Sequence, residues 1–265
     1  MNYDESWAGG VADLLCNAQA ERRAMPTLQD QGLCDAGAQL GHAYRVQAEG
    51  LRRRVARGDR EVGHKVAITT RRKLAELGLD APIFGRLLAS GDIPHGGSVS
   101  ASAFIAPRIE PEIAFVLGRE LKGPGCTLTD VQQATAFVAC AFEILDSRIQ
   151  AGPFHVFSAV ADNVSVARHV VGPRARRLDE VDLELAGCLL YLDDELVATG
   201  AGAQVLEHPA LAVVELANEL GRQGQALEAG SLVLTGGLIP AIPVRAGSRV
   251  RARVQGLGEV AVTFR

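Results

Sequence analysis

Two acids one residue apart open an apolar stretch between Pro107 and Leu117, PRIEPEIAFVL, and this stretch restricts the fold more than any other part of the chain. Successive side chains of a β-strand alternate between its faces, so Glu110 and Glu112 are expected to project from one side. The apolar run that follows them predicts a buried strand. Buried like charges raise each other's pKa or recruit a cation, and a divalent metal ion would neutralise them most directly.

A third acid fits the same site. Glu143 lies within VACAFEIL, residues 138–145, a second apolar run of strand length. A carboxylate buried there without a partner would cost several kcal/mol. Three carboxylates suit Mg²⁺ or Mn²⁺, because these ions prefer oxygen ligands, whereas zinc favours histidine and cysteine. The alternative is a surface pair of acids on an edge strand, together with a core Glu143 that is bound by an arginine.

Basic and polar residues near these strands are further candidates for the site. Lys65 lies in the apolar segment VGHKVAIT, so its side chain either extends to the surface or acts as an acid or base. Asp146, Ser147 and Arg148 follow the Glu143 strand and are expected to emerge beside the metal. Arg148 could hold a substrate carboxylate in a fork, or it could form a surface ion pair with Asp146.

Two loop motifs carry weaker signals. The polar pair Asp162-Asn163 follows an apolar run, which is also typical of an Asx turn. The sequence Thr235-Gly236-Gly237 stands at the end of a predicted strand. It is either a simple turn or a loop whose backbone N–H groups could hold an anion.

Charge and composition exclude several classes of protein. The net charge of −4 leaves no basic field for nucleic acid or for an anionic membrane surface. No apolar run approaches the ~20 residues of a membrane span, and the first residues lack the order of a signal peptide, so we expect a cytoplasmic protein. The five cysteines show no CxxC spacing, which disfavours a zinc site.

The order of expected elements predicts an α+β protein with an N-terminal helical segment, residues 1–60, and a β-rich catalytic domain, residues 61–265. Helices are expected at 5–24 and 33–57. The second ends in LRRRVARGDR, which we interpret as a solvated helix end, with a functional basic patch as the alternative. Thr129 or Asp130 is expected to cap a later helix that reaches Val138.

Several of these motifs together resemble one known family, that of 2-keto-4-pentenoate hydratase and 4-oxalocrotonate decarboxylase, within the fumarylacetoacetate hydrolase-like superfamily. The matching segments run in order from about Leu40 to the C-terminus: GHKVAIT, PRIEPEIAFVLG, FEILDSRI, VADN, TGAGAQVLEHP, VLTGG and GLGEVAVTF. The resemblance implies a mixed β-sandwich roll. It also implies Mg²⁺ or Mn²⁺ on three acids, which correspond here to Glu110, Glu112 and Glu143.

The resemblance also assigns roles to other residues. It implies that Lys65 is the active-site lysine and that Asp146 and Arg148 are catalytic. By the same resemblance, four residues of the matching motifs would contact the substrate: Ser147, Asp162, Thr235 and Gly236. The chain departs from the family by reading AITT where GLTS is usual after the lysine, and DNVSV where DNASS is usual. Both departures affect the shape of the pocket.

The implied chemistry belongs to the meta-cleavage catabolism of aromatic compounds, with a small anionic 2-oxo acid as substrate. Decarboxylation of 2-oxo-3-hexenedioate to 2-hydroxypenta-2,4-dienoate is favoured over hydration of the latter, because Ser158-Ala159 replaces the Asp-Thr pair that hydratases of the family tend to carry before VADN. A non-catalytic binding partner is the third alternative, which the loss of a ligand or of Lys65 would have favoured. The resemblance further implies a homo-oligomer that could associate with the partner hydratase or decarboxylase.

Overall fold

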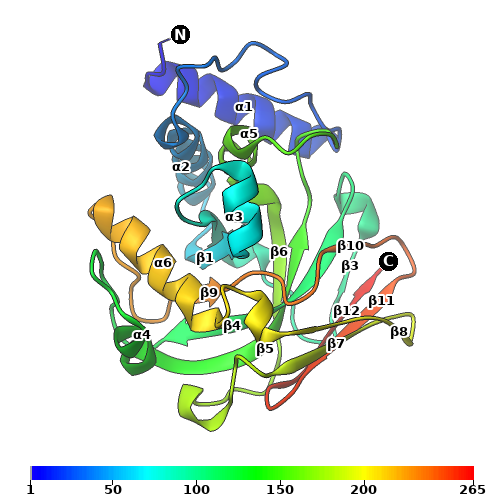
Figure 1. Ribbon diagram of the computed structural model, residues 1–265. Coiled ribbons are helices and arrows are strands. Elements are labelled where there is room, and N and C mark those ends of the chain that lie inside the picture. The colour runs from blue at the N-terminus through cyan, green and yellow to red at the C-terminus, as the bar shows by residue number, and fades with distance from the viewer. Residues whose placement is uncertain (1) are drawn as a thin grey trace.

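The computed structural model describes residues 2–265, which form two β-sheets flanked by helices (Figure 1). The helices are α1 Glu5–Glu21, α2 Leu40–Ala56, α3 Arg71–Leu77, α4 Leu128–Ala134, α5 Val156–Ala161 and α6 Pro209–Arg222. The strands are β1 Glu61–Ala67, β2 Ile83–Leu88, β3 Ser98–Val99, β4 Arg108–Leu117, β5 Thr135–Leu145, β6 Val166–Val171, β7 Gly187–Leu192, β8 Glu195–Ala201, β9 Leu232–Leu234, β10 Ile242–Pro243, β11 Arg249–Val254 and β12 Gly258–Phe264. Among these helices, none is long and apolar enough to cross a membrane.

The two sheets are mixed. The seven-stranded sheet has the order β2-β1-β9-β4-β5-β6, with β10 added to β4, and the five-stranded sheet has the order β3-β12-β11-β7-β8. Strand β1 is parallel to β9 and β12 is parallel to β3, whereas the other pairs are antiparallel. The predicted α+β class and mixed β-sandwich roll are therefore confirmed.

Strands β4 and β5 form the centre of the larger sheet because both of their faces are buried. On one face Ile113 and Phe142 join the main apolar core, which includes residues of β11 and β12. On the other face the small side chains Ala114 and Ala141 form a second cluster with Leu234. The small residues leave room on this face, which is also the face of the acids.

The edges of the larger sheet approach each other, so that the sheet curls. Strand β2 is joined to the segment before β6 by the side chain of Asn163, whose Oδ1 accepts the backbone N–H of Arg86 at 2.7 Å. The Nδ2 group of Asn163 donates to the carbonyl oxygen of Arg86 at 3.0 Å. The amide side chain thus completes the hydrogen bonding of an otherwise open strand edge.

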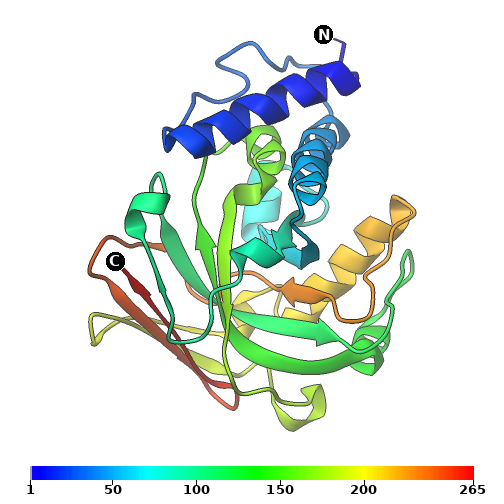
Figure 2. The same cartoon turned by 180° about the vertical axis from the view of Figure 1, so that it is seen from behind.

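Helices α1, α2 and α5 pack together at one end of the molecule, with α1 outermost (Figures 1 and 2). Residues 33–39 are a loop rather than part of the predicted helix 33–57, because the carboxylate of Asp35 accepts the N–H of Gly37 in a turn. Helix α4 is capped by Thr127 and not by Thr129 or Asp130, and Val138 lies in β5. The division of the chain at residues 60 and 61 stays a prediction.

Candidate metal centre

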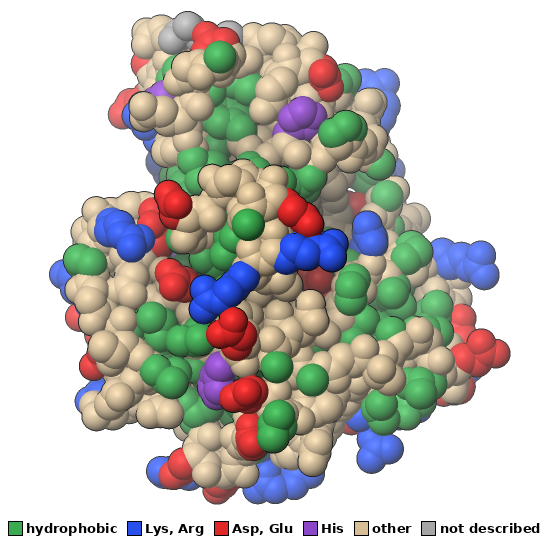
Figure 3. Space-filling model, in the orientation of Figure 1, with side chains coloured by type: hydrophobic (Ala, Val, Ile, Leu, Met, Phe, Trp, Pro, Cys, Tyr) green, Lys and Arg blue, Asp and Glu red, His purple; other side chains and the backbone are tan. Residues whose placement is uncertain are grey.

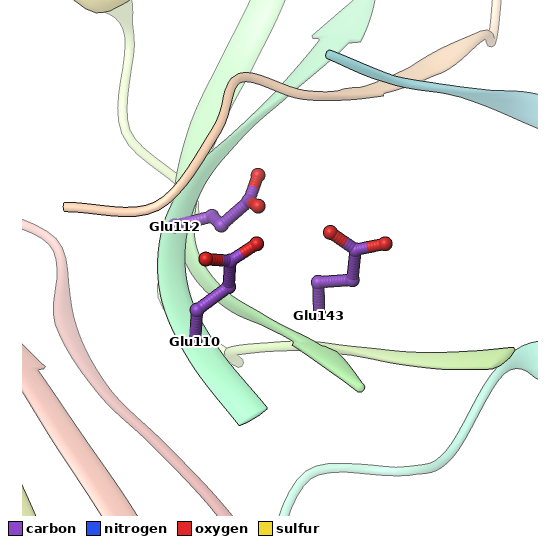
Figure 4. A group of neighbouring side chains, drawn as sticks. All are labelled: Glu110, Glu112 and Glu143. Carbon is purple, nitrogen blue, oxygen red and sulfur yellow. The ribbon is translucent and has the colours of Figure 1, made fainter. Parts of the chain in front are cut away.

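The pairing of β4 with β5 brings the three predicted acids together. Glu110 lies directly opposite Glu143 in the antiparallel register, and Glu112 follows two residues later on the same face. One carboxylate oxygen from each residue lies within 4.8 Å of the others, and the three side chains converge on one volume (Figure 4). Glu112 and Glu143 are fully buried, whereas Glu110 is partly exposed.

The environment of the acids disfavours three free negative charges. Burial, and next the charge of Glu143, raise the pKa of Glu110 to about 7, and the same causes raise the pKa of Glu112 well above its usual range. Among residues 2–265, Oε1 of Glu112 and Oε1 of Glu143 are buried and accept no hydrogen bond. Unpaired buried carboxylate oxygens that face each other fit a hard divalent cation such as Mg²⁺ or Mn²⁺.

Lys65 on β1 is the one protein cation bonded to this cluster within the described chain. Its side chain is 1% exposed, and Nζ donates to Oε2 of Glu143 at 2.9 Å. Burial alone would lower the pKa of Lys65, but the charges of the three glutamates outweigh burial and hold the pKa above its usual value. The lysine is therefore charged. Because its side chain does not extend to the surface, the remaining prediction is that it acts as an acid or base.

The loop Thr235-Gly236-Gly237 packs against the acids. The N–H of Gly236 donates to Oε2 of Glu112 at 2.7 Å, and the hydroxyl of Thr235 donates to the carbonyl of Ile113 at 2.9 Å. A Cβ at Gly237 would lie 2.5 Å from Oε2 of Glu110 and 2.9 Å from the backbone oxygen of Ile239, so a larger residue there would displace the Glu110 carboxylate. The direct contacts of this loop are with Glu112 and β4, which favours a role in orienting the acids over a role as an anion cradle.

Asp146 and Arg148 have structural partners. The carboxylate of Asp146 accepts the backbone N–H groups of Ile105 and Ala106 at 2.9 and 2.8 Å, and so fixes the segment that leads into β4. Arg148 is buried, and its Nε donates to Oδ1 of Asp162. Its other nitrogens donate to the backbone carbonyls of Asp146, Asp162 and Val166. The predicted surface ion pair between Arg148 and Asp146 is therefore wrong. The guanidinium of Arg148, which was expected to hold a substrate carboxylate, binds Asp162 instead.

Ser147 is the member of this segment that reaches open space. It lines a cavity of about 410 Å³ together with Arg108 and Leu145, which are paired across β4 and β5. These two residues lie two positions from Glu110 and Glu143 along the strands, so the cavity lies near the acids, although none of the three lines it. The face seen in Figure 3 is hollowed near its centre, with basic side chains at the rim.

Sequence reasoning did not single out Arg108. It lies two residues before Glu110, so strand alternation places it on the face of the acids, and that spacing was the available signal. Its side chain is exposed and donates to the carbonyl of Ala241. Asp162, by contrast, was expected to contact substrate. It is buried, and its pKa is raised to about 6 by burial, against the opposing charge of Arg148.

We expect replacement of Arg148 by methionine to lower the free energy of unfolding by about 3–5 kcal/mol, because it leaves the Asp162 carboxylate buried without its cation. Urea unfolding followed by circular dichroism measures this loss. Arg72→Met is the matched control, since Arg72 is exposed and pairs with Glu76 on the surface, where ~0–1 kcal/mol is expected. Equal urea midpoints for the two variants would contradict a structural role for Arg148.

Comparison with known proteins gives consistent results. A model of the family described as fumarylacetoacetate (FAA) hydrolase C-terminal matches residues 55–265. The chain is 42% identical to the 4-oxalocrotonate decarboxylase of Pseudomonas sp. (strain CF600) over 84% of both chains. It is 37% identical to the 2-keto-4-pentenoate hydratase of Burkholderia vietnamiensis (strain G4 / LMG 22486) over 98% of both chains.

A solved structure covers nearly the whole chain. The 4-oxalocrotonate decarboxylase from Pseudomonas putida G7, complexed with magnesium and adipate, superposes with a TM-score of 0.94 at 37% identity. The match covers 99% of this chain and 98% of that one, which includes the N-terminal helices. The same protein has also been solved with calcium and acetate.

Proposed function

Because the chain belongs to the fumarylacetoacetate (FAA) hydrolase C-terminal family, we propose that it is a divalent-metal-dependent lyase acting on a 2-oxo-alkenoate. The favoured reaction is decarboxylation of 2-oxo-3-hexenedioate to 2-hydroxypenta-2,4-dienoate. The observation that carries the proposal is the meeting of Glu110, Glu112 and Glu143 beside the buried, charged Lys65. The identity with decarboxylases and the match to one that binds magnesium and adipate support it.

The three glutamates would hold the cation, which is Mg²⁺ or Mn²⁺ by the chemistry of their oxygens. When bound, such a cation acts as a Lewis acid toward the 2-oxo group of the substrate. The N–H of Gly236 keeps Glu112 in place through the 2.7 Å bond to its Oε2. Asp146 fixes the start of β4, and the Arg148–Asp162 pair fixes the segment after β5. We assign these residues positioning roles.

Lys65 supplies the protonated group of the site. In the decarboxylation the C5–C6 bond of the substrate breaks and CO₂ leaves. The electron pair then moves through the conjugated chain to the 2-oxo oxygen, which takes a proton. The ammonium of Lys65 is held at 2.9 Å from Glu143, so it can offset the negative charge as it develops and then donate that proton.

Arg108 is the residue we assign to the second carboxylate of the diacid. It is exposed in the cavity near the acids. Its guanidinium can bind a carboxylate there, whereas that of Arg148 is bonded to Asp162. Adipate, which is bound in the solved relative, is a six-carbon diacid of the same chain length as 2-oxo-3-hexenedioate. A site with a cation at one end and an arginine farther along the strands suits such a substrate.

We expect Arg108→Ala to raise KM for 2-oxo-3-hexenedioate by about 10–100-fold, since a charge-assisted hydrogen bond contributes ~1.5–3 kcal/mol. The inhibition constant of the monoacid product 2-hydroxypenta-2,4-dienoate, which lacks the second carboxylate, should not change. Steady-state kinetics with the diacid, in the presence and absence of the monoacid, measures the difference, with the exposed Arg119→Ala as control. Equal increases of the KM of the diacid and of the inhibition constant of the monoacid would show that Arg108 does not recognise the second carboxylate.

The hydratase is the second candidate. Its support is the 37% identity over 98% of the chain to a 2-keto-4-pentenoate hydratase. The same acids and Lys65 would serve it, with water adding to the dienoate. The deciding experiment supplies the purified protein and Mg²⁺ with 2-oxo-3-hexenedioate and, separately, with 2-hydroxypenta-2,4-dienoate. Release of CO₂ supports the decarboxylase, and loss of the dienoate to a hydroxy-keto acid supports the hydratase.

Assembly and location are finer points of the same proposal. We keep the expectations of a cytoplasmic homo-oligomer and of association with the partner hydratase or decarboxylase. Exposed apolar side chains on the β7–β8 hairpin, Leu189, Leu196 and Val197, support an interface between copies of the chain. Light scattering of the purified protein measures its oligomeric state.

A further inference from the structure

A second cavity is lined by residues of helices α1 and α2 and of strands β2 and β6. Figure 2 shows these two helices at one end of the molecule. The volume of the cavity is about 70 Å³, whereas one water molecule needs about 10–15 Å³. It shares no lining residue with the cavity beside the metal centre. This inner cavity is therefore separate from the site assigned to the 2-oxo acid.

The inner cavity is rich in positive charge. Arg54, Arg86 and Arg148 line it, and Asp162 is the one acid among its described lining residues. Asp162 is already paired with Arg148. Arg54 is partly buried, bonds to the amide oxygen of Gln19, and forms no ion pair within residues 2–265. Burial, and next the charge of Arg148, lower the pKa of Arg54.

Two buried side-chain nitrogens at this cavity also lack partners. Nε of Arg86 is buried without a hydrogen-bond partner, although the other nitrogens of the side chain bond to Glu61 and Gln225. Nδ1 of His169 is likewise buried and unpaired among the described residues, and the side chain is 3% exposed. Buried polar atoms are normally satisfied, so such a pair on one cavity indicates a missing polar partner.

An open cleft leads into the inner cavity. This outer cleft has a volume of about 810 Å³ and shares Cys16, Gln19, Arg54 and Ser90 with the inner cavity. Its other lining residues include Arg57 and Arg60, which form no ion pair among the described residues, and Arg53, which is paired with Glu49 and Asp13. The acid of the cleft, Asp59, accepts hydrogen bonds from Ser90. The basic segment LRRRVARGDR thus lines a cleft in addition to forming a solvated helix end.

We propose that this cleft and cavity bind a small organic anion at a site separate from the metal centre. The anionic group, a carboxylate or a phosphate, lies on Arg54 at the junction of cleft and cavity, where the guanidinium offers two parallel N–H donors. Leu15, Val46 and Leu51 line the inner cavity and contact the carbon part of the ligand. The ligand thereby supplies an acceptor to Arg54 and to the unpaired Nε–H of Arg86.

The experiment is isothermal titration calorimetry of the Mg²⁺-loaded protein at constant ionic strength, with glycerol 3-phosphate and succinate as probes. We expect a Kd below about 1 mM for at least one probe, and an at least about tenfold weaker Kd for Arg54→Met. Arg52→Met is the control, because Arg52 lies on the same helix, is exposed, and lines neither the cleft nor the cavity. The control should bind as the unchanged protein does.

A second variant tests the cavity without removing a charge. Gly50 lines the cavity, and a Cβ added there meets no atom within 4 Å. Gly50→Leu should therefore fold, fill the cavity and abolish binding. Binding of one probe alone identifies the anionic group as phosphate or carboxylate and supports the site. The proposal is overturned if neither probe saturates the unchanged protein, if Gly50→Leu and Arg54→Met bind normally, or if Arg52→Met loses binding equally.

Discussion

Glu110→Gln is expected to abolish metal-dependent turnover while the protein stays folded. Glutamine keeps the shape of the side chain but removes one of the three carboxylates within 4.8 Å of one another. Loss of residues that only support a metal ligand costs about 10–100-fold in affinity, so loss of a ligand should weaken Mg²⁺ binding by more than about 100-fold. Calorimetric titration with Mg²⁺ and the CO₂ assay measure the two effects.

The metal-free variant should be at least as stable as the unchanged protein. The raised pKa of Glu110 reflects burial and the repulsion of Glu143, both of which the neutral amide relieves. Thermal unfolding in EDTA tests this point. Glu120→Gln, at an exposed position just after β4, is the matched control and should keep full activity. Full turnover of Glu110→Gln would exclude the three-acid site.

The acid cluster could be predicted from sequence because it depends on short-range rules. Alternation along one strand places Glu110 and Glu112 on one face. A charge inside the apolar run of β5 indicated that Glu143 belongs to the same site. The antiparallel register places Glu143 opposite Glu110. Lys65 was expected to be either exposed or functional, and its full burial excludes the first alternative.

The partners of Arg148 could not be predicted in the same way. Asp162 is 14 residues away and reaches Arg148 only because α5 folds the chain back on itself. Nothing in the local pattern distinguishes this buried pair from a substrate clamp or from a pair with Asp146. The Asn163 link to Arg86 spans 77 residues and depends on the curl of the whole sheet. The hydrogen-bond partners of these polar residues therefore depend on the tertiary fold and not on the local sequence.

Lys65→Met is expected to lower kcat by about 10²–10⁴-fold, because it removes the group that offers a proton and a positive charge beside the acids. Binding of Mg²⁺ should stay as tight or become tighter, since a positive charge 2.9 Å from Glu143 no longer opposes the cation. The two measurements thus move in different directions. A merely structural lysine would not produce this pattern, because its loss would weaken metal binding and turnover together.

The same variant links the lysine to stability. Without metal, Lys65→Met leaves three carboxylates without their cation, and a broken buried pair costs about 3–5 kcal/mol. Saturating Mg²⁺ should restore most of this loss, because an ion that binds only the folded state stabilises it. Lys122→Met, at an exposed position, should change neither stability nor kcat. If Lys65→Met kept its kcat, the proton and the charge in the reaction would have to come from another group, and the assignment of Lys65 would be wrong.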